Sequence, residues 1–404
     1  MCVPLTGVHA LVGPNGSGKS AFMDVLAFVR DVLRVGVRDA VFGNAGAGIP
    51  KRAVSPLELS WCQQGGPIEI AVVARAPDRL VSEDSPLRIL RYELAVDVHP
   101  ELRCTREQLW LCPREQERPP LRQIESFPQD TEESCRKVRT QTPRGWRRVV
   151  SRTESGEDFF RAETRSWKER VRYDSERSVL TNLPADEQRF PRAHWFKRLL
   201  MEGTFALALN PEKMKLPSPA GSPSVLMADG SNLPHVVHWL ETRDPDRLAD
   251  WIGRVRALLC DVLAIRSRET PEDRSRYIEV EYANGLKLPS RLLSDGTLRL
   301  LALMILSYVP SAPRTILLED PENGIHPQAI PHVIDSLHAV QDAQVILATH
   351  STHVLRFLGR HQLLCFGKTP KGNVDVVAGE EHPSLKEWRA EDHLGEALAA
   401  GVLG

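Results

Sequence analysis

The sequence lacks any apolar run of the roughly 18 residues that a transmembrane helix needs. A secretory leader is also missing, because the chain reaches Gly13 before an apolar leader core is complete. The net charge is only −1 over 404 residues, so no excess of one sign marks the chain as a nucleic-acid or membrane binder. These absences predict a cytoplasmic protein without membrane contact, whose basic surfaces are local.

Cysteine pairs are missing as well. The seven cysteines are scattered and form no C-x-x-C motif, which argues against a zinc site and a disulfide framework. The chain shows no internal repeat and no heptad run long enough for a coiled coil. Its length fits two or three domains, and an apolar content of 42% suffices for a sizeable core.

A glycine-rich loop at residues 13–20 separates a predicted buried strand (8–12) from a predicted helix (20–35). It fits the pattern G-x-x-x-x-G-K-[ST] in the context that the pattern requires. Backbone N–H groups turn toward phosphate, the lysine neutralises phosphate charge, and the serine ligates Mg²⁺. The loop therefore predicts ATP and Mg²⁺ binding through Gly13, Pro14, Asn15, Gly16, Ser17, Gly18, Lys19 and Ser20.

A second apolar strand, predicted at 315–318, ends in Glu319 and Asp320. An ATPase of this kind needs one carboxylate for Mg²⁺ and a group that orients the attacking water. By position, Glu319 is expected on the metal and Asp320 as the base. Most such enzymes have Asp before Glu, so the two roles stay open. A short Asp at the base position favours slow hydrolysis, with Glu322 as a candidate helper.

Residues 293–299, Leu-Ser-Asp-Gly-Thr-Leu-Arg, precede an apolar helix predicted at 297–308. Ser294 suits the N-cap of this helix, which is a purely structural interpretation. A serine hydroxyl, a glycine N–H and a helix N-terminus also form an anion site. Because residues 13–20 already hold one ATP, Ser294 and Gly296 are expected to contact the γ-phosphate held by a second copy.

Residues 348–351, Ala-Thr-His-Ser, follow another predicted buried strand at 345–348. A lone histidine is more often structural. At the exit of a strand beside the acidic strand, however, His350 is placed to hydrogen-bond the γ-phosphate and to respond to its loss. The predicted catalytic set is therefore Asp320, Glu319 and His350, with Ser20 and Glu319 as metal ligands.

The remaining pattern predicts an α/β fold. Antiparallel strands are expected at 57–62, 68–74 and 89–98, edge strands at 109–112 and 147–152, and a hairpin with a type I′ turn at Asn284-Gly285. Helices are expected at 192–201, 234–242, 245–263 and 328–340. This divides the chain into an N-terminal part of an ATPase head (1–98), an Arg/Pro-rich insertion (99–229), a helical segment (230–275) and a C-terminal part of the head (276–404).

These four motifs, in this order, resemble the ABC ATPase superfamily. The residues of these motifs are similar to those of the soluble branch of RecF, SMC and OLD-type ATPases. The similarity includes Glu-Asp-Pro-Glu-Asn-Gly-Ile-His-Pro at 319–327 and Asp-Gly-Ser-Asn-Leu-Pro at 229–234. The resemblance implies a mixed central sheet with an antiparallel β subdomain, split by a long α+β insertion. It also implies that ATP joins two heads, each site pairing one copy's phosphate loop with the other's Ser294 and Gly296.

The sequence departs from this family in three places. Only about a dozen residues precede the phosphate loop, where relatives have further strands. Either the start is truncated or misassigned, or another segment fills the gap, which leaves adenine binding and protection of the sheet edge open. Some fifty residues follow His350, too few for an OLD-type nuclease domain, so a separate nuclease or toxin is expected as effector. The Mg²⁺-sensing glutamine has only weak candidates, Gln63 and Gln64.

Arginine and lysine gather with aromatic residues between 136 and 198, around Trp146, Trp167 and Trp195. Such a run suits phosphate contacts and base stacking on DNA or RNA. Interspersed acids allow a solvated insert, and a protein-docking surface is a third interpretation.

The leading hypothesis is an ATPase that senses infection and controls an effector in bacterial anti-phage defence, as stand-alone members of the branch often do. The alternatives are a RecF-like DNA-repair ATPase and a nearly non-hydrolysing scaffold. The nucleotide-binding subunit of a membrane transporter fits less well, because residues 20–294 are too long for one.

Overall fold

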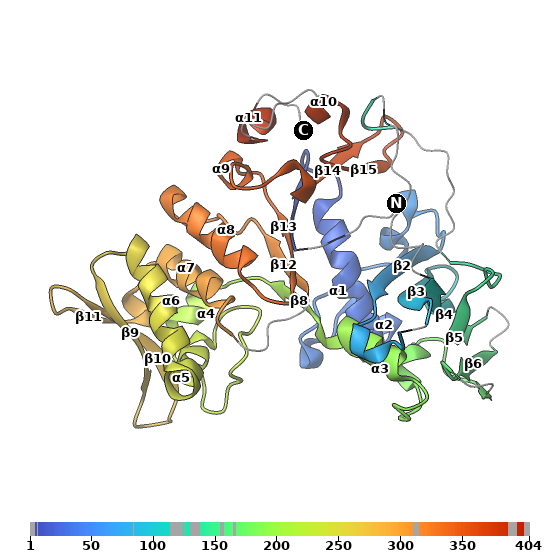
Figure 1. The fold of residues 1–404 in the computed structure, drawn as a ribbon, viewed down its shortest axis with the longest axis horizontal. Helices are drawn as coiled ribbons and strands as arrows, with labels where there is room; N and C mark the ends of the chain where they lie inside the picture. The colour runs from blue at the N-terminus through green and yellow to red at the C-terminus, as the bar shows by residue number, and fades with distance from the viewer. Residues whose placement is uncertain are drawn as a thin grey trace.

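The computed structural model describes residues 5, 7–83, 85–113, 124, 126–129, 138–153, 157–164, 167–309, 315–386 and 394–399. Three sheets organise this part of the chain, one central and one on each side of it (Figure 1). The antiparallel sheet on one side and a helical lobe on the other are joined through the central sheet. The phosphate loop, the acidic pair and His350 follow strands of this sheet.

The central sheet has six strands in the order β15-β14-β1-β13-β12-β8. All neighbours pair in parallel except β14 and β15. The strands are β1 (Val8–Val12), β8 (Thr204–Leu207), β12 (Thr315–Glu319), β13 (Gln344–Ala348), β14 (Leu363–Lys368) and β15 (Val374–Ala378). The buried runs predicted at 8–12, 315–318 and 345–348 are therefore confirmed as strands. β8 was not predicted.

Helices cover both faces of this sheet, as its continuous apolar strands require. Leu11 and Ile346 pack with Met23 of α1 (Lys19–Val35) on one face. Ala10 and Leu347 point to the other face, toward the helices α7 (Asp295–Ile305) and α8 (Ile330–His338). Short helices α9 (Thr352–Leu355), α10 (Pro383–Lys386) and α11 (Leu394–Ala399) complete this side.

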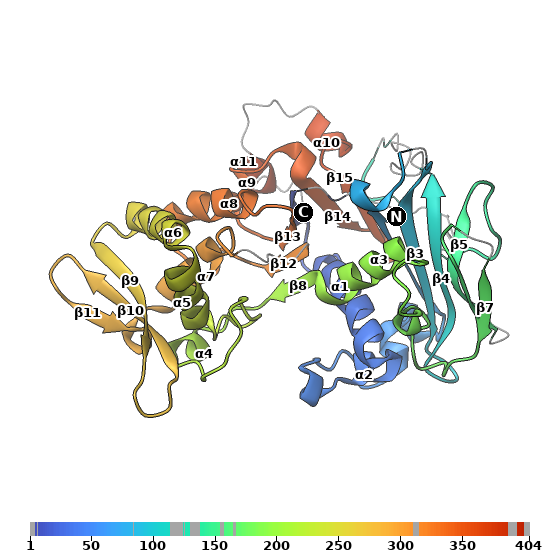
Figure 2. The ribbon, with the colours of Figure 1, turned by 60° about the horizontal axis from the view of Figure 1, so that its bottom comes forward.

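The second sheet is an antiparallel meander, β2-β3-β4-β5-β6-β7. It comprises β2 (Ile68–Arg75), β3 (Leu87–Asp97), β4 (Arg103–Pro113), β5 (Arg147–Arg152), β6 (Asp158–Arg161) and β7 (Lys168–Val171), with α2 (Val37–Phe42) and α3 (Pro191–Glu202) against it (Figure 2). The predicted boundary between residues 98 and 99 falls inside this sheet, because β3 pairs with β4. β4 and β5 are also interior strands, not the edge strands that their short apolar runs suggested.

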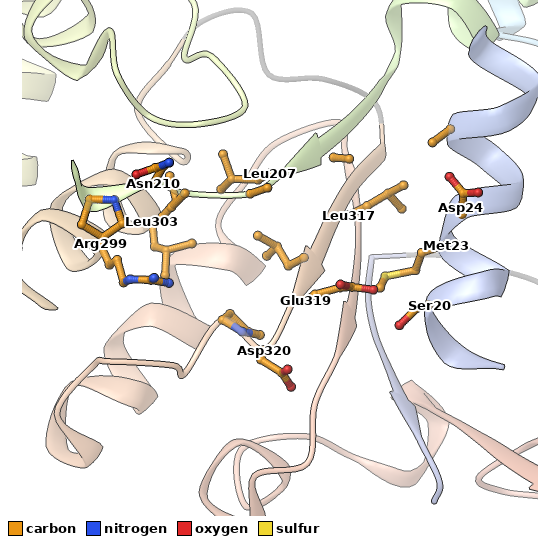
Figure 3. Close-up of a pocket in the computed structure, with 17 residues that line it drawn as sticks. Ser20, Met23, Asp24, Leu207, Asn210, Arg299, Leu303, Leu317, Glu319 and Asp320 are labelled. Atoms are coloured by element: carbon orange, nitrogen blue, oxygen red, sulfur yellow. The ribbon is translucent and has the colours of Figure 1, made fainter. Parts of the chain in front are cut away.

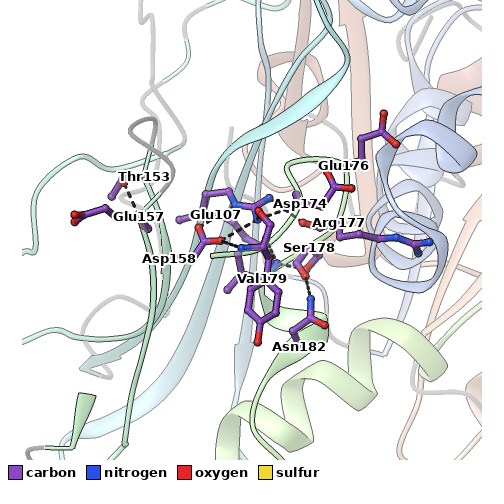
Figure 4. Close-up of polar contacts among 12 residues, drawn as sticks. Glu107, Thr153, Glu157, Asp158, Asp174, Glu176, Arg177, Ser178, Val179 and Asn182 are labelled. Carbon is purple, nitrogen blue, oxygen red and sulfur yellow. Dashed lines mark hydrogen bonds and ion pairs between the residues drawn. The ribbon is translucent and has the colours of Figure 1, made fainter. Parts of the chain in front are cut away.

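Buried carboxylates make the arginine-rich strands compatible with this interior position. Glu107 on β4 accepts hydrogen bonds from the Tyr92 and Ser178 hydroxyls and from backbone N–H groups (Figure 4). Arg152 forms a buried ion pair with Asp158 at 3.0 Å. A buried charge is tolerated only when it is paired and hydrogen-bonded, and these residues satisfy one another.

The helical lobe contains α4 (Pro211–Lys215), α5 (Leu233–Arg243), α6 (Pro245–Leu258) and α7, with the sheet β9 (Val262–Glu269), β10 (Arg276–Tyr282), β11 (Lys287–Pro289). Helices were predicted at the positions of α5 and α6. The helix predicted at 245–263 is shorter in the structure, because α6 ends at Leu258 and the residues from Val262 belong to β9. The β10–β11 turn is not type I′, because Gly285 has a φ of 82° while Asn284 does not have a positive φ. The Gly285 N–H donates to Tyr282 O, which fits a three-residue loop.

One predicted strand is wrong. Residues 57–62 form parts of two 3-10 turns, η2 (Pro56–Leu59) and η3 (Trp61–Gln63). The alternation of apolar and polar residues there matches a strand, but Pro56 removes a backbone donor and starts a turn.

Candidate functional site

Three motifs meet at one edge of the central sheet. Leu11 of β1 and Glu319 of β12 both lie opposite Ala348 of β13. Because the strands are parallel, the phosphate loop, the acidic pair and His350 all leave the sheet from neighbouring positions at its carboxyl edge. Ligands of open parallel sheets bind at this edge. The predicted gathering of these residues agrees with the register.

The phosphate loop, residues 13–20, has the backbone that its glycines permit. Gly13, Gly16 and Gly18 all have positive φ values, and α1 begins directly at Lys19. A Cβ on Gly13 would lie 2.2 Å from Phe366 O, so only glycine fits against β14. The side chain of Ser17 is buried with its hydroxyl unpaired within the described residues. These features leave the N-terminus of α1 open to an anion.

Lys19 folds back over the loop, where its ammonium donates to Gly13 O at 2.8 Å and to Pro14 O at 2.9 Å. Burial lowers the pKa of Lys19, and the nearby charge of Asp320 partly opposes this shift. The phosphate-loop lysine and the acidic pair are therefore electrostatically coupled across the site. A buried ammonium of this kind is stabilised by negative charge placed beside it.

A cavity of about 550 Å³ joins the phosphate loop to the helical lobe (Figure 3). Ser20 and Asp24 of α1 line one end, and Arg299 of α7 lines the other. Glu319 and Asp320 lie between these ends. The predicted metal ligands, Ser20 and Glu319, thus share one cavity with the predicted base.

The two acids have different backbones. Glu319 ends β12 in the ladder, whereas Asp320 has a φ of 42° and donates its N–H to Ala348 O at 2.9 Å. A left-handed backbone is uncommon for a residue other than glycine, and aspartate and asparagine tolerate it best. Such outliers cluster at functional sites. The reversed order of the acids therefore coincides with a sharp turn at the second one.

Glu322 does not line this cavity, and instead connects the loop after β12 to Thr349. Its carboxylate accepts a hydrogen bond from the Thr349 hydroxyl, while Oε2 is buried without a partner in the described structure. Burial raises the pKa of Glu322. The imidazole of His350 itself is exposed. Glu322 thus holds Thr349, the residue before the predicted γ-phosphate sensor.

Ser294 is the N-cap of α7, as predicted: its hydroxyl accepts the Thr297 N–H at 3.1 Å. Gly296 lies so close to the loop after β12 that an added Cβ would meet Gly324 O at 2.4 Å. Ser294 is exposed, and neither residue lines the cavity beside Ser20. The structure therefore keeps these residues apart from the phosphate loop of their own chain.

A residue that the sequence analysis missed is Asn210, which lines the cavity at the end of the edge strand β8. β8 pairs with β12, and Leu207 lies opposite Leu318, the residue before Glu319. The segment that follows β8 and contains Asn210 therefore leaves the sheet at the same edge as Glu319. The two predicted glutamines, Gln63 and Gln64, lie outside the cavity. The only signal in the sequence was the short apolar run 204–207 before Asn-Pro.

The arginine-rich region does not present its aromatic rings to solvent as a stacking surface. Trp146 packs edge-on against buried Trp110 under Arg139, and Trp167 packs edge-on against Phe190. Several of its arginines are paired internally, among them Arg139 with Glu93, Arg152 with Asp158 and Arg192 with Glu163. Residues 136, 137 and 165 lie outside the described part. Cations that remain exposed include Arg161, Lys168, Arg170 and Arg172.

The donor set fits Mg²⁺ bound together with phosphates. Within the described residues no group of three or more His, Cys, Asp or Glu side chains forms a self-contained metal cage. Magnesium in phosphate-transfer sites is held by one or two protein oxygens plus substrate phosphates, which Ser20 and Glu319 can provide. Among the described helices, none is long and apolar enough to span a membrane.

Comparison with known proteins agrees with this geometry. A family described as "AAA domain, putative AbiEii toxin, Type IV TA system" matches residues 8–356. No curated protein matches the chain. An SMC head bound to the C-winged helix domain of ScpA is 14% identical, with a TM-score of 0.50 over 93% of this chain and 91% of that chain. This likeness shows that the fold is that of an ABC-type ATPase head.

Two further SMC heads have lower TM-scores. An Smc head with an extended coiled coil bound to the C-terminal domain of ScpA, from Pyrococcus furiosus, gives 0.43 at 12% identity, over 95% of this chain and 94% of that chain. The SMC head from Thermotoga maritima gives 0.39 at 13% identity, over 93% and 92%.

Proposed function

From the premise that this chain belongs to the AAA-domain family matching residues 8–356, we propose that it is an ATPase whose heads pair around ATP. In each site, residues 13–20 of one copy hold the triphosphate, and Ser294 and Gly296 of the second copy close it. We further propose that this pairing controls a separate nuclease or toxin in bacterial anti-phage defence, in the cytoplasm. The defence role rests on the family resemblance.

One observation carries the pairing proposal. Ser294 presents an exposed hydroxyl at a helix N-terminus, yet the cavity of its own chain ends at Arg299, in the second turn of the same helix. A helix N-terminus with a hydroxyl is an anion site, and its own phosphate loop does not reach it. A second head supplies the missing phosphate if two copies face each other by twofold symmetry, the commonest arrangement of homodimers.

The roles within the proposed site follow the geometry. Lys19 neutralises phosphate charge, Ser20 and Glu319 hold Mg²⁺, and Asp320 orients the attacking water. Bound Mg²⁺ neutralises charge that develops on the phosphate oxygens. Asn210 lines the Arg299 end of the same cavity, where its carboxamide oxygen accepts the Lys213 N–H and caps α4. His350 contacts the γ-phosphate, and Glu322 links its loss to the loop 321–327.

Lys19→Ala tests the ATPase proposal directly. The variant is expected to lose ATP binding and ATP-dependent pairing while its fold persists, because Lys19 makes only local contacts to Gly13 and Pro14. Binding is measured by calorimetry and pairing by light scattering with and without ATP and Mg²⁺. Wild-type ATP affinity in Lys19→Ala would refute the phosphate-loop assignment.

The effector proposal is tested by co-purification with the products of neighbouring genes, with and without ATP and Mg²⁺. A stoichiometric complex with a nuclease or toxin, altered by ATP in the wild type and not in Lys19→Ala, is the expected result. A chain that pairs with ATP and retains DNA without a protein partner would favour the RecF-like alternative. Lys168 and Arg170 of β7 are exposed cations that can contact DNA phosphates, and this observation supports the RecF-like alternative.

A further inference from the structure

An exposed tryptophan, Trp61, lies near the phosphate loop and has no role in the proposed ATPase chemistry. Its side chain is 53% exposed in η3, just before β2. The next two residues, Cys62 and Gln63, have φ values of 48° and 59°, which are costly for side chains other than glycine. A strained backbone that holds a large ring in solvent is a reason to look for a ligand.

The turn between β14 and β15 connects Trp61 to the phosphate loop. A Cβ placed on Gly372 would lie 3.6 Å from Cη2 of Trp61, so the indole ring lies against this turn. Two residues later, Val374 is 46% exposed, and its Cγ2 lies 3.3 Å from the Cβ position of Gly18. Two residues span about 7 Å at most, so Trp61, the turn and Gly18 are neighbours. Figure 2 shows the segment before β2 beside β15.

The strand order gives the direction in which a bound nucleotide extends. The acidic pair follows β12, and β13 lies between β12 and β1, which carries the phosphate loop. β14 and β15 lie on the opposite side of β1. A triphosphate with its γ-phosphate at Asp320 therefore directs its sugar and base toward β14, β15 and Trp61.

We propose that Trp61 and Val374 form the base-binding platform of the nucleotide site. The indole of Trp61 stacks on one face of the purine, and Val374 packs against the sugar beside Gly18. Gln63 and Gln64, two and three residues after Trp61, are exposed, and their carboxamides offer donors and acceptors to the edge of the base. This inference rests on the proposed ATPase function and gives the glutamines, which are outside the cavity, a role in base recognition.

The platform combines two segments that are distant in the sequence. η3 supplies a ring, and the β14–β15 turn supplies an apolar side chain beside Gly18. Ring stacking on a base contributes enough affinity to be measured by substitution.

The test compares two ligands, Mg²⁺–ATP and Mg²⁺–tripolyphosphate, by calorimetry. Trp61→Ala is expected to weaken ATP binding about tenfold or more and to leave tripolyphosphate binding unchanged, because only ATP carries a base. Trp61→Phe keeps a ring and should retain most of the ATP affinity. Leu286→Ala, which trims another exposed apolar side chain in the distant β10–β11 turn, is the matched control and should bind both ligands normally.

Fluorescence gives an independent readout. ATP should quench tryptophan emission in the wild type, while tripolyphosphate should not, and the quenched component should be missing in Trp61→Phe. Unchanged ATP affinity in Trp61→Ala overturns the platform and leaves the ATPase proposal intact. A wild-type chain that binds neither ligand overturns both.

Discussion

At the scale of single residues, the two acids after β12 have separable roles because their backbones differ. Asp320→Asn is expected to lower turnover about a hundredfold or more, the usual contribution of a positioned base, while ATP still binds. Glu319→Gln should instead weaken ATP binding in a way that added Mg²⁺ partly restores. Phosphate release and ATP affinity, each measured over a range of Mg²⁺ concentrations, distinguish the two. Normal turnover in Asp320→Asn would assign the base elsewhere.

Glu322 gives a prediction in pH. Its raised pKa means that the folded protein holds this proton more tightly than the unfolded chain does. Its contribution to stability is therefore fully present below the ordinary glutamate pKa, near about 4.3, and is lost as the pH rises through the raised value. Glutamine at position 322 does not titrate, so Glu322→Gln does not lose this stability. The melting temperature of Glu322→Gln relative to that of the wild type should therefore increase from acidic to neutral pH.

Melting curves across that range test the prediction for Glu322. Glu380→Gln, at an exposed glutamate, serves as the control and should follow the wild type at every pH. A difference between Glu322→Gln and wild type that does not change with pH would contradict the linkage.

Residue-level reading succeeded where the chemistry is local. The phosphate loop, the N-cap at Ser294 and the acids at a strand end each depend on a few consecutive residues, and the structure places them as expected. Asn210 was missed because its place depends on β8 pairing with β12, more than a hundred residues later in the chain. No local pattern encodes such a pairing.

At the scale of elements, the start of α7 has both a structural and a proposed functional use. Ser294→Ala removes the cap and should cost about 1 kcal/mol of stability. Asp244→Ala removes the equivalent cap of α6, where Asp244 accepts the Arg247 N–H at 3.2 Å, and should cost a similar amount. Only Ser294→Ala is expected to abolish ATP-dependent pairing as well, as measured by light scattering. Equal loss of pairing in both variants would reduce Ser294 to a structural cap.

The same scale shows why the middle of the chain was misread. Its polar, arginine-rich composition is typical of a solvated insert, and this composition predicted a boundary with the head after residue 98. In the structure, β4 and β5 are interior strands. Arg152 of β5 is paired with Asp158, and Arg139, which precedes β5, is paired with Glu93 of β3. Composition reports charge, whereas burial depends on which carboxylate lies on the neighbouring strand.

At the scale of the whole molecule, the proposed pair makes each ATP site a joint product of two chains. Lys19→Ala damages one half of every site, and Ser294→Ala damages the other half. Each variant alone should therefore be inactive. In a mixed pair, however, the intact phosphate loop of the Ser294→Ala chain faces the intact Ser294 of the Lys19→Ala chain.

Mixing the two inactive variants in equal amounts should restore ATP hydrolysis. Pairs of two identical variant chains contain no intact site and are not expected to form, so the pairs that form with ATP are mixed. Each mixed pair has one intact site of two, so turnover of up to about half the wild-type value is expected from symmetric association. The mixture is assayed at concentrations where the wild type pairs, with Lys19→Ala plus Asp320→Asn as the control. In that control the site with the intact phosphate loop has lost its base, so no activity should return. A Lys19→Ala and Ser294→Ala mixture that stays inactive while its chains still pair would mean that each head acts alone.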